Sequence, residues 1–534
     1  MALFGAAQSR VDDERNHFVE AIGNRENDIR QLATAHHPNA LPCELFRLPG
    51  SRGFMARGTF NICFFVQFPT GERWVVRIPL RPCLAVSARS KLESEIATMS
   101  SAPSICPCVF VGILTRVRLV TERTTIPIPQ IVGYSLAETC DPLSTYIIME
   151  YVEGGTLSMD RLRSATASQR DNLYKSLAKV YTQLRRLEFP AIGRLGQCTD
   201  GFEVCRRALT IDMNGLQIEG LDPFSTQASY HDKNDSLVSA NDYIAMRLQI
   251  SWNAFLKGRN SIEQGMAANV LYHLQLFCKH VEKWKDPALD RGPFVLTHGD
   301  LGPQNLIVDD TLEIKAVIDW EWSRVVPVQL FTPPLWLTCR DTPYVTAPNS
   351  YKLYLKKALL NFLEAVRTQE LSTFGEDRLF EEWTSRKDNA EPLVANALEN
   401  WTDIDWFAYL YLSKGDDAKL EEDVRSFIEA DPIRGLITRM KEDDTIAYVE
   451  EMQQLEDVKA RSAMPDNRVT ISRLADWMSS EHMKLWTMQS LPLFAGASIV
   501  FVGGLLVGRK LEAIPRLVAG LSLSVSRLVS GSAP

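Results

Sequence analysis

The stretch FVLTHGDLGPQNLIVDDTLEIKAVIDWEW, residues 294–322, decides the fold of this chain. Three short apolar runs in it, 294–296, 306–308 and 314–318, have the length and composition of buried strands. Polar side chains stand where these predicted strands end. In chain order they are His298, Asp300, Asn305 and Asp319. The pattern places two carboxylates and one amide at the ends of short strands.

This set of side chains fits phosphoryl transfer. Such a reaction needs a carboxylate that orients the attacking hydroxyl and accepts its proton, and an amide and a second carboxylate that hold Mg²⁺ on the phosphates. In protein kinases the catalytic Asp precedes the metal-binding Asn by five residues. Asp300 and Asn305 keep that interval, and Asp319 follows one predicted strand later. The alternative is a hairpin whose Asp and Asn only cap turns.

The motifs HGDLGPQN and VIDWEW resemble the aminoglycoside phosphotransferase family, and in particular its large fungal branch. The resemblance implies an α+β, protein-kinase-like fold of two lobes, with a small antiparallel-sheet N-lobe and a larger, mainly helical C-lobe. It implies ATP and Mg²⁺ as cofactors, Asp300 as the catalytic base, and Asn305 and Asp319 as metal ligands. His298, grouped with the catalytic residues, is expected to brace the loop rather than to transfer protons.

A protein kinase in the strict sense is less favoured. It would show D-F-G followed by A-P-E, whereas this chain has Asp319-Trp320-Glu321 and no such activation segment.

Composition and charge narrow the class further. The 534 residues exceed what one compact domain usually needs, and the net charge of −8 does not favour a nucleic-acid-binding surface. The ten cysteines show no zinc-site spacing, and the N-terminus MALFGAAQSRVDDERN lacks the apolar core of a signal peptide. We therefore expect an intracellular, cytoplasmic enzyme with reduced cysteines and no nucleic-acid partner.

Residues 294–322 are called the catalytic stretch below. The order of elements before the catalytic stretch is that of a kinase N-lobe. Residues 1–40 are expected to form a helical extension, and residues 41–153 the N-lobe itself. Turn residues bound three expected strands, at 44–48, 60–68 and 74–78.

The glycine-bearing segment 50–59 stands where kinases cover the phosphates. Its glycines do not form G-x-G-x-x-G, so an ordinary hairpin turn is the alternative. The nucleotide contacts expected here are backbone N–H groups near Gly58 and Asn61.

Further residues are expected to serve the nucleotide. Arg77, in WVVRIP, falls where kinases place the lysine that binds the α- and β-phosphates, and it keeps the charge without the compact shape. Glu95, in a helix predicted at 91–99, is expected to pair with Arg77. A solvated surface charge is the alternative for each. Backbone groups of Glu150 to Val152, at the end of a strand predicted at 146–152, are expected to bond the adenine edge.

The segment SSAPSICPCVFVGILTRV, residues 100–117, interrupts this order. It is apolar, carries two cysteines and does not continue the helical period. We interpret it as a translated intron or a lineage-specific insert. Transcript reads that join the codons of Met99 and Arg118 would support the intron.

Residues 154–460 are expected to form the helical C-lobe. Periodic apolar residues predict helices at 166–187, 241–257 and 262–284, and the Gly-, Asp-, Ser- and Pro-rich segment 196–240 is expected to be irregular. The acidic, helical part at 350–460 is expected to help form the acceptor pocket. An acidic pocket would suit a cationic acceptor, although an acidic run is usually a solvated helix face.

The C-terminal region divides into a linker or helix at 461–490 and a hydrophobic tail at 491–534. Within the tail, residues 491–508 carry no charge and have the minimum length of a membrane span. The basic residues after it conflict with the positive-inside rule. A tail anchor or a hairpin in one leaflet would remove the conflict, and a buried or docking helix is the alternative.

The sequence thus predicts an ATP- and Mg²⁺-dependent phosphotransferase that acts on a hydroxyl of a small molecule. The alternatives are a catalytically silent kinase-fold scaffold and a kinase of protein substrates. The acceptor stays open, since the resemblance is compatible with aminoglycosides, choline-like alcohols, sugars and amino acids.

Overall fold

The computed structural model describes residues 6–48, 53–99, 123–198, 201–232, 236–386 and 390–463. The segment 100–117 and the possible membrane segment 491–508 lie outside these residues. The chain divides into two compact units, Met1–Met452 and Gln453–Pro534, and the N-lobe and the C-lobe up to Met452 belong to the first.

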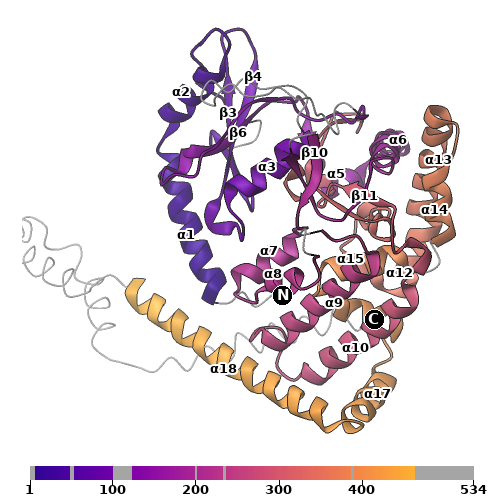
Figure 1. Cartoon of the computed structure of the whole chain (residues 1–534). Coiled ribbons are helices and arrows are strands. Elements are labelled where there is room, and N and C mark those ends of the chain that lie inside the picture. The colour runs from indigo at the N-terminus through magenta and orange to yellow at the C-terminus, as the bar shows by residue number, and fades with distance from the viewer. Residues whose placement is uncertain are drawn as a thin grey trace, which may run out of the picture. The chain divides into compact units, whose positions relative to one another are not determined.

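A six-stranded antiparallel sheet forms the N-lobe. Its order is β1-β3-β4-β6-β5, and β2 pairs with β3 (Figure 1). The strands are β1 (Glu44–Leu45), β2 (Met55–Arg57), β3 (Asn61–Gln67), β4 (Arg73–Pro79), β5 (Ile131–Leu136) and β6 (Thr145–Glu150). The helices of this lobe are α1 (Ala6–Gly23), α2 (Glu26–His36) and α3 (Ala88–Met99).

Alternation along β4 decides which of its side chains reach the site. Trp74, Val76 and Ile78 pack into the core that the sheet forms with α1 and α2. Because successive side chains of a strand point to opposite faces, Arg77 points the other way, toward α3, and is buried there. On β6, Ile148 packs into this same core. The residues on either side of Ile148 point to the opposite face and pack into a second, larger hydrophobic core, which includes α3.

Two details of the N-lobe differ from the prediction. The expected helical extension consists of two helices, which are separated by Asn24 and Arg25. The predicted turn at 50–59 contains a strand, β2, because Met55 pairs with Phe64 and the N–H of Gly58 donates to the carbonyl of Asn61 at 2.9 Å. The loop between β2 and β3 is therefore only a short hairpin tip.

Helices make up most of the C-lobe. They are α5 (Met159–Ser164), α6 (Ala167–Leu184), α7 (Ile211–Ile218), α8 (Pro223–Ala228), α9 (Ala240–Lys257), α10 (Ala267–Trp284), α11 (Thr342–Thr346), α12 (Pro348–Leu353), α13 (Leu360–Phe374), α14 (Arg378–Arg386), α15 (Glu391–Glu399), α16 (Asp403–Trp406), α17 (Asp417–Glu429) and α18 (Pro432–Ala463). The predicted acidic, helical character of 350–460 is confirmed. The described part of the chain holds no helix with both the length and the hydropathy of a membrane span.

Short strands carry the catalytic stretch. One sheet has the order β14-β11-β8 and another the order β13-β12-β7. The strands are β7 (Gly155–Thr156), β8 (Glu188–Phe189), β11 (Phe294–Thr297), β12 (Leu306–Val308), β13 (Ile314–Val317) and β14 (Arg324–Pro327). The three predicted strands of this stretch are confirmed.

The prediction of an irregular segment at 196–240 is wrong. A hairpin of β9 (Arg194–Cys198) and β10 (Gly201–Arg206) begins it, and α7 and α8 follow. The hairpin contacts α3, and α7 and α8 begin at side-chain caps from Thr210 and Asp222. Tertiary packing and capping outweigh the turn-rich composition here.

Taken together, an antiparallel-sheet lobe and a mainly helical lobe joined between β6 and β7 give the α+β, protein-kinase-like fold. The main hydrophobic core runs through both, since Leu92 and Ile96 of α3 belong to the same cluster as Val317 and Trp320 of the catalytic stretch.

Candidate active site

The loop after β11 holds Asp300 in a defined orientation. The side-chain amide of Asn305 donates to the backbone carbonyl of Asp300 at 2.6 Å and to its carboxylate Oδ2 at 3.0 Å. The amide of Gln304 donates to the other carboxylate oxygen at 3.4 Å. These bonds turn the carboxylate of Asp300 toward Asn305 while it stays half-buried.

His298 fixes this loop from behind. Its Nε2 lies 2.8 Å from the carbonyl of Ile318, and its Nδ1 accepts the N–H of Asp300 at 3.4 Å. The two bonds require the neutral tautomer with the proton on Nε2. Burial lowers the pKa of His298 to about 4, so the ring is neutral near pH 7. A neutral, buried, fully bonded ring agrees with the predicted bracing role.

Asp319 lies next to Asn305 because the strands pair there. The N–H of Ile318 donates to the carbonyl of Asn305 at 3.0 Å, directly before Asp319. Asp319 has φ +62°, a left-handed conformation that non-glycine residues adopt mainly where the surroundings enforce it, often at functional sites. Its carboxylate accepts from Arg77 at 2.6 Å and remains 38% exposed.

Arg77 joins the two lobes. One guanidinium nitrogen pairs with Asp319 and the other with Glu95 of α3, and both Arg77 and Glu95 are buried. Burial raises the pKa of Glu95 and Arg77 opposes that shift, while the surrounding carboxylates keep Arg77 protonated. The predicted pairing of Glu95 with Arg77 is thus confirmed; Glu93 pairs with Arg89 instead, at 2.7 Å.

A second buried ion pair lies beside the first, and sequence reasoning missed it. The ammonium of Lys91 is 2.8 Å from the carboxylate of Glu321, and it lies 4.8 Å from the ring centres of both Phe60 and Trp322. Asn61 also donates to Glu321, at 2.8 Å. Burial lowers the pKa of Lys91; burial would raise that of Glu321, but Lys91 and Arg77 together lower it.

Two signals could have indicated this pair. Lys91 precedes Glu95 by four residues and so shares its helix face. Glu321 follows Asp319 by two residues within the motif already singled out.

The other predicted nucleotide-binding residues are placed as follows. Gly58 lies exposed at the tip of the β2–β3 hairpin, whereas Asn61 is buried and braces Glu321. The N–H of Glu150 donates to the carbonyl of Gln130 at 2.9 Å, so this N–H is not available to an adenine edge. Val152 follows β6, where the chain passes between the lobes.

The residues present fit Mg²⁺ and a nucleotide. Within the described residues, Arg77 Nε, Glu95 Oε1 and Asn61 Oδ1 are buried without a hydrogen-bond partner, although buried polar atoms are nearly always paired. Asn305 and Asp319 offer the amide and carboxylate oxygens that Mg²⁺ accepts when phosphates complete its shell. Among the described residues, no group of three or more His, Cys, Asp or Glu is suited to a metal.

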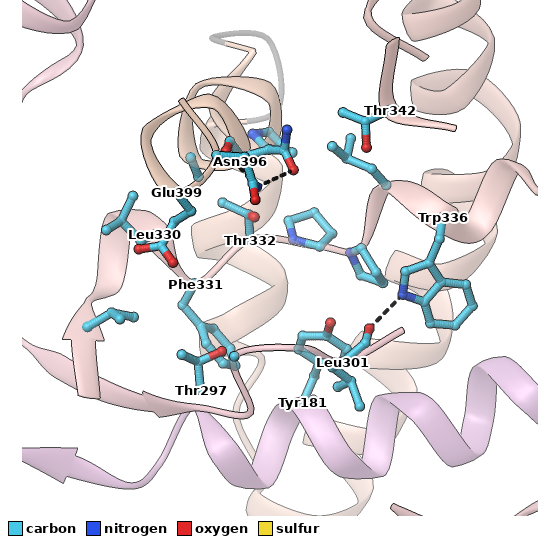
Figure 2. Close-up of a pocket in the computed structure, with 18 of the residues that line it drawn as sticks. Tyr181, Thr297, Leu301, Leu330, Phe331, Thr332, Trp336, Thr342, Asn396 and Glu399 are labelled. Carbon is cyan, nitrogen blue, oxygen red and sulfur yellow. Dashed lines mark hydrogen bonds between the residues drawn. The ribbon is translucent and has the colours of Figure 1, made fainter. Parts of the chain in front are cut away.

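A pocket of about 510 Å³ opens beside the catalytic loop (Figure 2). Gly299 and Leu301, which flank Asp300, belong to its lining. The pocket therefore adjoins the loop that carries Asp300, although Asp300 itself is not among the lining residues.

Gly299→Ala is expected to disturb the catalytic loop. Gly299 has φ +83°, and a Cβ there would lie 2.1 Å from the carbonyl oxygen of Trp322. The matched control is Gly71→Ala, since Gly71 has φ +89° but nothing within 4 Å of the added carbon. We expect the control to cost about 1 kcal/mol of unfolding free energy through backbone strain alone, and Gly299→Ala to cost clearly more.

Urea denaturation of both variants measures the difference. Equal costs would show that the loop relaxes around the added methyl group.

Comparison with known proteins places this geometry in a family. The model of the phosphotransferase enzyme family, APH, matches residues 61–329. The match spans half of the chain and contains β3, α3 and the whole catalytic stretch. The chain belongs to this phosphotransferase family.

Individual relatives are more distant. A subtelomeric hrmA-associated cluster protein of Aspergillus fumigatus is 27% identical over 146 residues, which are 27% of this chain and 25% of that protein. The matched segment therefore spans only about a quarter of the curated relative. The GDP complex of aminoglycoside 2'-phosphotransferase-IIIa is 14% identical, with 71% of this chain and 98% of that chain covered and a TM-score of 0.35. Macrolide 2'-phosphotransferase type I is 14% identical, with 75% and 95% covered and a TM-score of 0.33.

Proposed function

We propose that this protein transfers the γ-phosphoryl group of ATP to a hydroxyl of a small molecule, in the presence of Mg²⁺. The observation that carries the proposal is the constellation of Asp300, Asn305 and Asp319, held against Arg77 and Glu95. Membership of the phosphotransferase family supports the same reaction class. Because ATP is the donor, we place the reaction inside the cell.

Each residue has a distinct role in this proposal. Asp300 accepts the proton of the acceptor hydroxyl while the oxygen of that hydroxyl bonds to the γ-phosphorus. The bond between the γ-phosphorus and the β-phosphate oxygen breaks, which yields ADP and a phosphate ester. Asn305 and Asp319 would hold Mg²⁺, which would neutralise charge on the phosphates. Arg77 contacts the phosphates, and Glu95 orients Arg77.

The remaining contacts concern the rest of the nucleotide. The hairpin tip at Gly58 covers the phosphates, and Asn61 supports that tip from below. The carbonyl of Glu150 and the backbone of Val152 bind the adenine edge.

A silent scaffold is the second candidate, and nucleotide binding separates the two. If the proposal holds, Mg²⁺·ATP raises the melting temperature, because a ligand at about 100 times its Kd stabilises the fold by about 2.7 kcal/mol. Asp319→Asn removes a metal ligand and is expected to abolish the Mg²⁺-dependent part of this rise. Asp310→Asn, at an exposed acid of the β12–β13 turn, is the matched control.

A thermal-shift titration of ATP with and without Mg²⁺ measures the effect. No Mg²⁺-dependent rise in the wild-type protein would contradict the proposal and favour the scaffold.

A further inference from the structure

The pocket beside the catalytic loop carries chemistry that bears on the acceptor. One wall is the catalytic loop with Leu301, and across from it lies α15 with Asn396 and Glu399 (Figure 2). Residues 330–336 connect these walls. Its volume of about 510 Å³ is that of a site for a ligand of drug-like size.

The charged side chains of the lining cancel one another. They are Arg324, Arg340, Asp341 and Glu399. Arg340 and Asp341 lie exposed at the rim, where water screens them, and Arg340 stacks over the ring of Tyr344 at 4.7 Å. The inner pair consists of Arg324 and Glu399.

Both carboxylate oxygens of Glu399 already have partners within the protein. One of its carboxylate oxygens pairs with Arg324, which is buried, and the other accepts the hydroxyl of Tyr243 at 2.8 Å. Its backbone carbonyl accepts a further cation, Arg247, at 3.0 Å. The acid that faces the pocket is therefore already paired with a cation, and a cationic ligand would compete with Arg324 for its charge.

The rest of the lining is apolar or neutral. Phe331, Pro333 and Pro334 line it, and Trp336 adds a ring whose N–H donates to the carbonyl of Leu301 at 2.8 Å (Figure 2). That bond ties the apolar wall to the residue after Asp300, so a body packed on this wall lies against the loop that carries the catalytic carboxylate.

Amide groups supply the polar contacts. Asn396 is oriented by its donation to Asp403 at 2.7 Å, and its carbonyl oxygen accepts from Asn400 at 3.3 Å. Thr332 and Thr342 add hydroxyls to the lining. These neutral groups can bind hydroxyls or carbonyls but provide no counter-charge for an ammonium group.

We infer that the acceptor is an uncharged hydroxyl compound with an apolar or ring-shaped body, and not a polycation. The inference rests on the proposed phosphotransfer and specifies its substrate class. It replaces the expectation of a cationic acceptor, because the acidic character of 350–460 does not extend to the inner lining of this pocket.

A matched pair of glycosides tests the inference. Phenyl β-D-glucoside and its 2-amino-2-deoxy analogue differ in one protonated amine, and kanamycin serves as a polycation. Binding is measured by calorimetry on the full chain, with and without Mg²⁺ and a non-hydrolysable ATP analogue. We expect the neutral glycoside to bind at least about tenfold more tightly than the amino glycoside, because a buried ammonium without a partner is costly.

A variant reverses the charge balance. Thr332→Asp places an unpaired acid in the middle of the lining and is expected to shift the affinity ratio toward the amino glycoside by about tenfold. Thr373→Asp, an exposed position on α13 outside the lining, is the matched control and leaves the ratio unchanged. The wild-type ratio keeps the test valid if Thr332→Asp does not fold.

The outcomes separate the inference from the proposed function. Tighter binding of the amino glycoside or of kanamycin to the wild-type protein would overturn the inference and leave phosphotransfer intact. Binding of the nucleotide analogue without binding of either glycoside would also overturn it. Failure of Mg²⁺-dependent nucleotide binding would instead contradict the proposed function.

Discussion

Asp300→Asn is expected to lower phosphoryl transfer by about 10²–10⁴-fold and to leave Mg²⁺-dependent nucleotide binding unchanged. The substitution keeps the shape of the side chain and its contact with Asn305 but removes the proton acceptor. Initial rates of ADP release, with the acceptor that gives the fastest turnover in the glycoside panel, measure the loss.

The pH dependence provides a second readout of the same residue. Burial raises the pKa of Asp300, although Asn305 opposes the shift. The base must be ionised, so the rate is full above this raised pKa and falls as the pH drops through it. His298, with a pKa of about 4, adds no loss near pH 6.5. The rate therefore falls at a higher pH than it would with a base that has the ordinary pKa of an aspartate.

Glu313→Gln is the control for Asp300→Asn, since Glu313 is half-exposed and its contact is a surface pair with Lys315. We expect this control to retain the wild-type rate. A rate for Asp300→Asn within a few-fold of wild type would remove Asp300 from the role of base, whatever the nucleotide affinity.

Lys91→Met is expected to cost about 3–5 kcal/mol of unfolding free energy. The substitution keeps the aliphatic stem but leaves Glu321 buried without its ion-pair partner. It also removes the cation between the rings of Phe60 and Trp322. Urea denaturation followed by circular dichroism measures the loss.

Two comparisons make this result specific. Lys315→Met removes a half-exposed lysine from surface pairs and is expected to cost less than about 1 kcal/mol. The double variant Lys91→Met/Glu321→Gln removes both charges and is expected to recover most of the stability. A single variant as stable as Lys315→Met would show that Glu321 does not depend on Lys91.

The two predictions concern contacts that could not be inferred equally well from the sequence. Asp300 and Asn305 are five residues apart in one loop, so their spacing in the sequence already describes their contact. Lys91 and Glu321 come from a helix of one lobe and a turn of the other, and only packing of α3 against the residues after Asp319 joins them. A pattern of local spacing contains no information on such a pair.

The acceptor pocket shows the same limit. The sequence of 350–460 is acidic, and that composition favoured a cationic acceptor. In the fold, however, Glu399 of this segment meets Arg324 from β14 and Tyr243 from α9. Charge composition describes a whole segment, whereas ligand choice depends on the few side chains that face the pocket and on their partners.

By itself, then, the sequence determined the strands of the catalytic stretch, and its resemblance to a known family implied the two-lobed fold and the pairing of Glu95 with Arg77. The strands follow from short apolar runs bounded by turn residues, which can be recognised without knowledge of the rest of the chain. The tertiary structure alone decided the Lys91–Glu321 pair, the burial of Asn61, 260 residues from its partner, and the charge balance of the pocket. These depend on which faces meet, and that is settled by packing over the whole core rather than by any one segment.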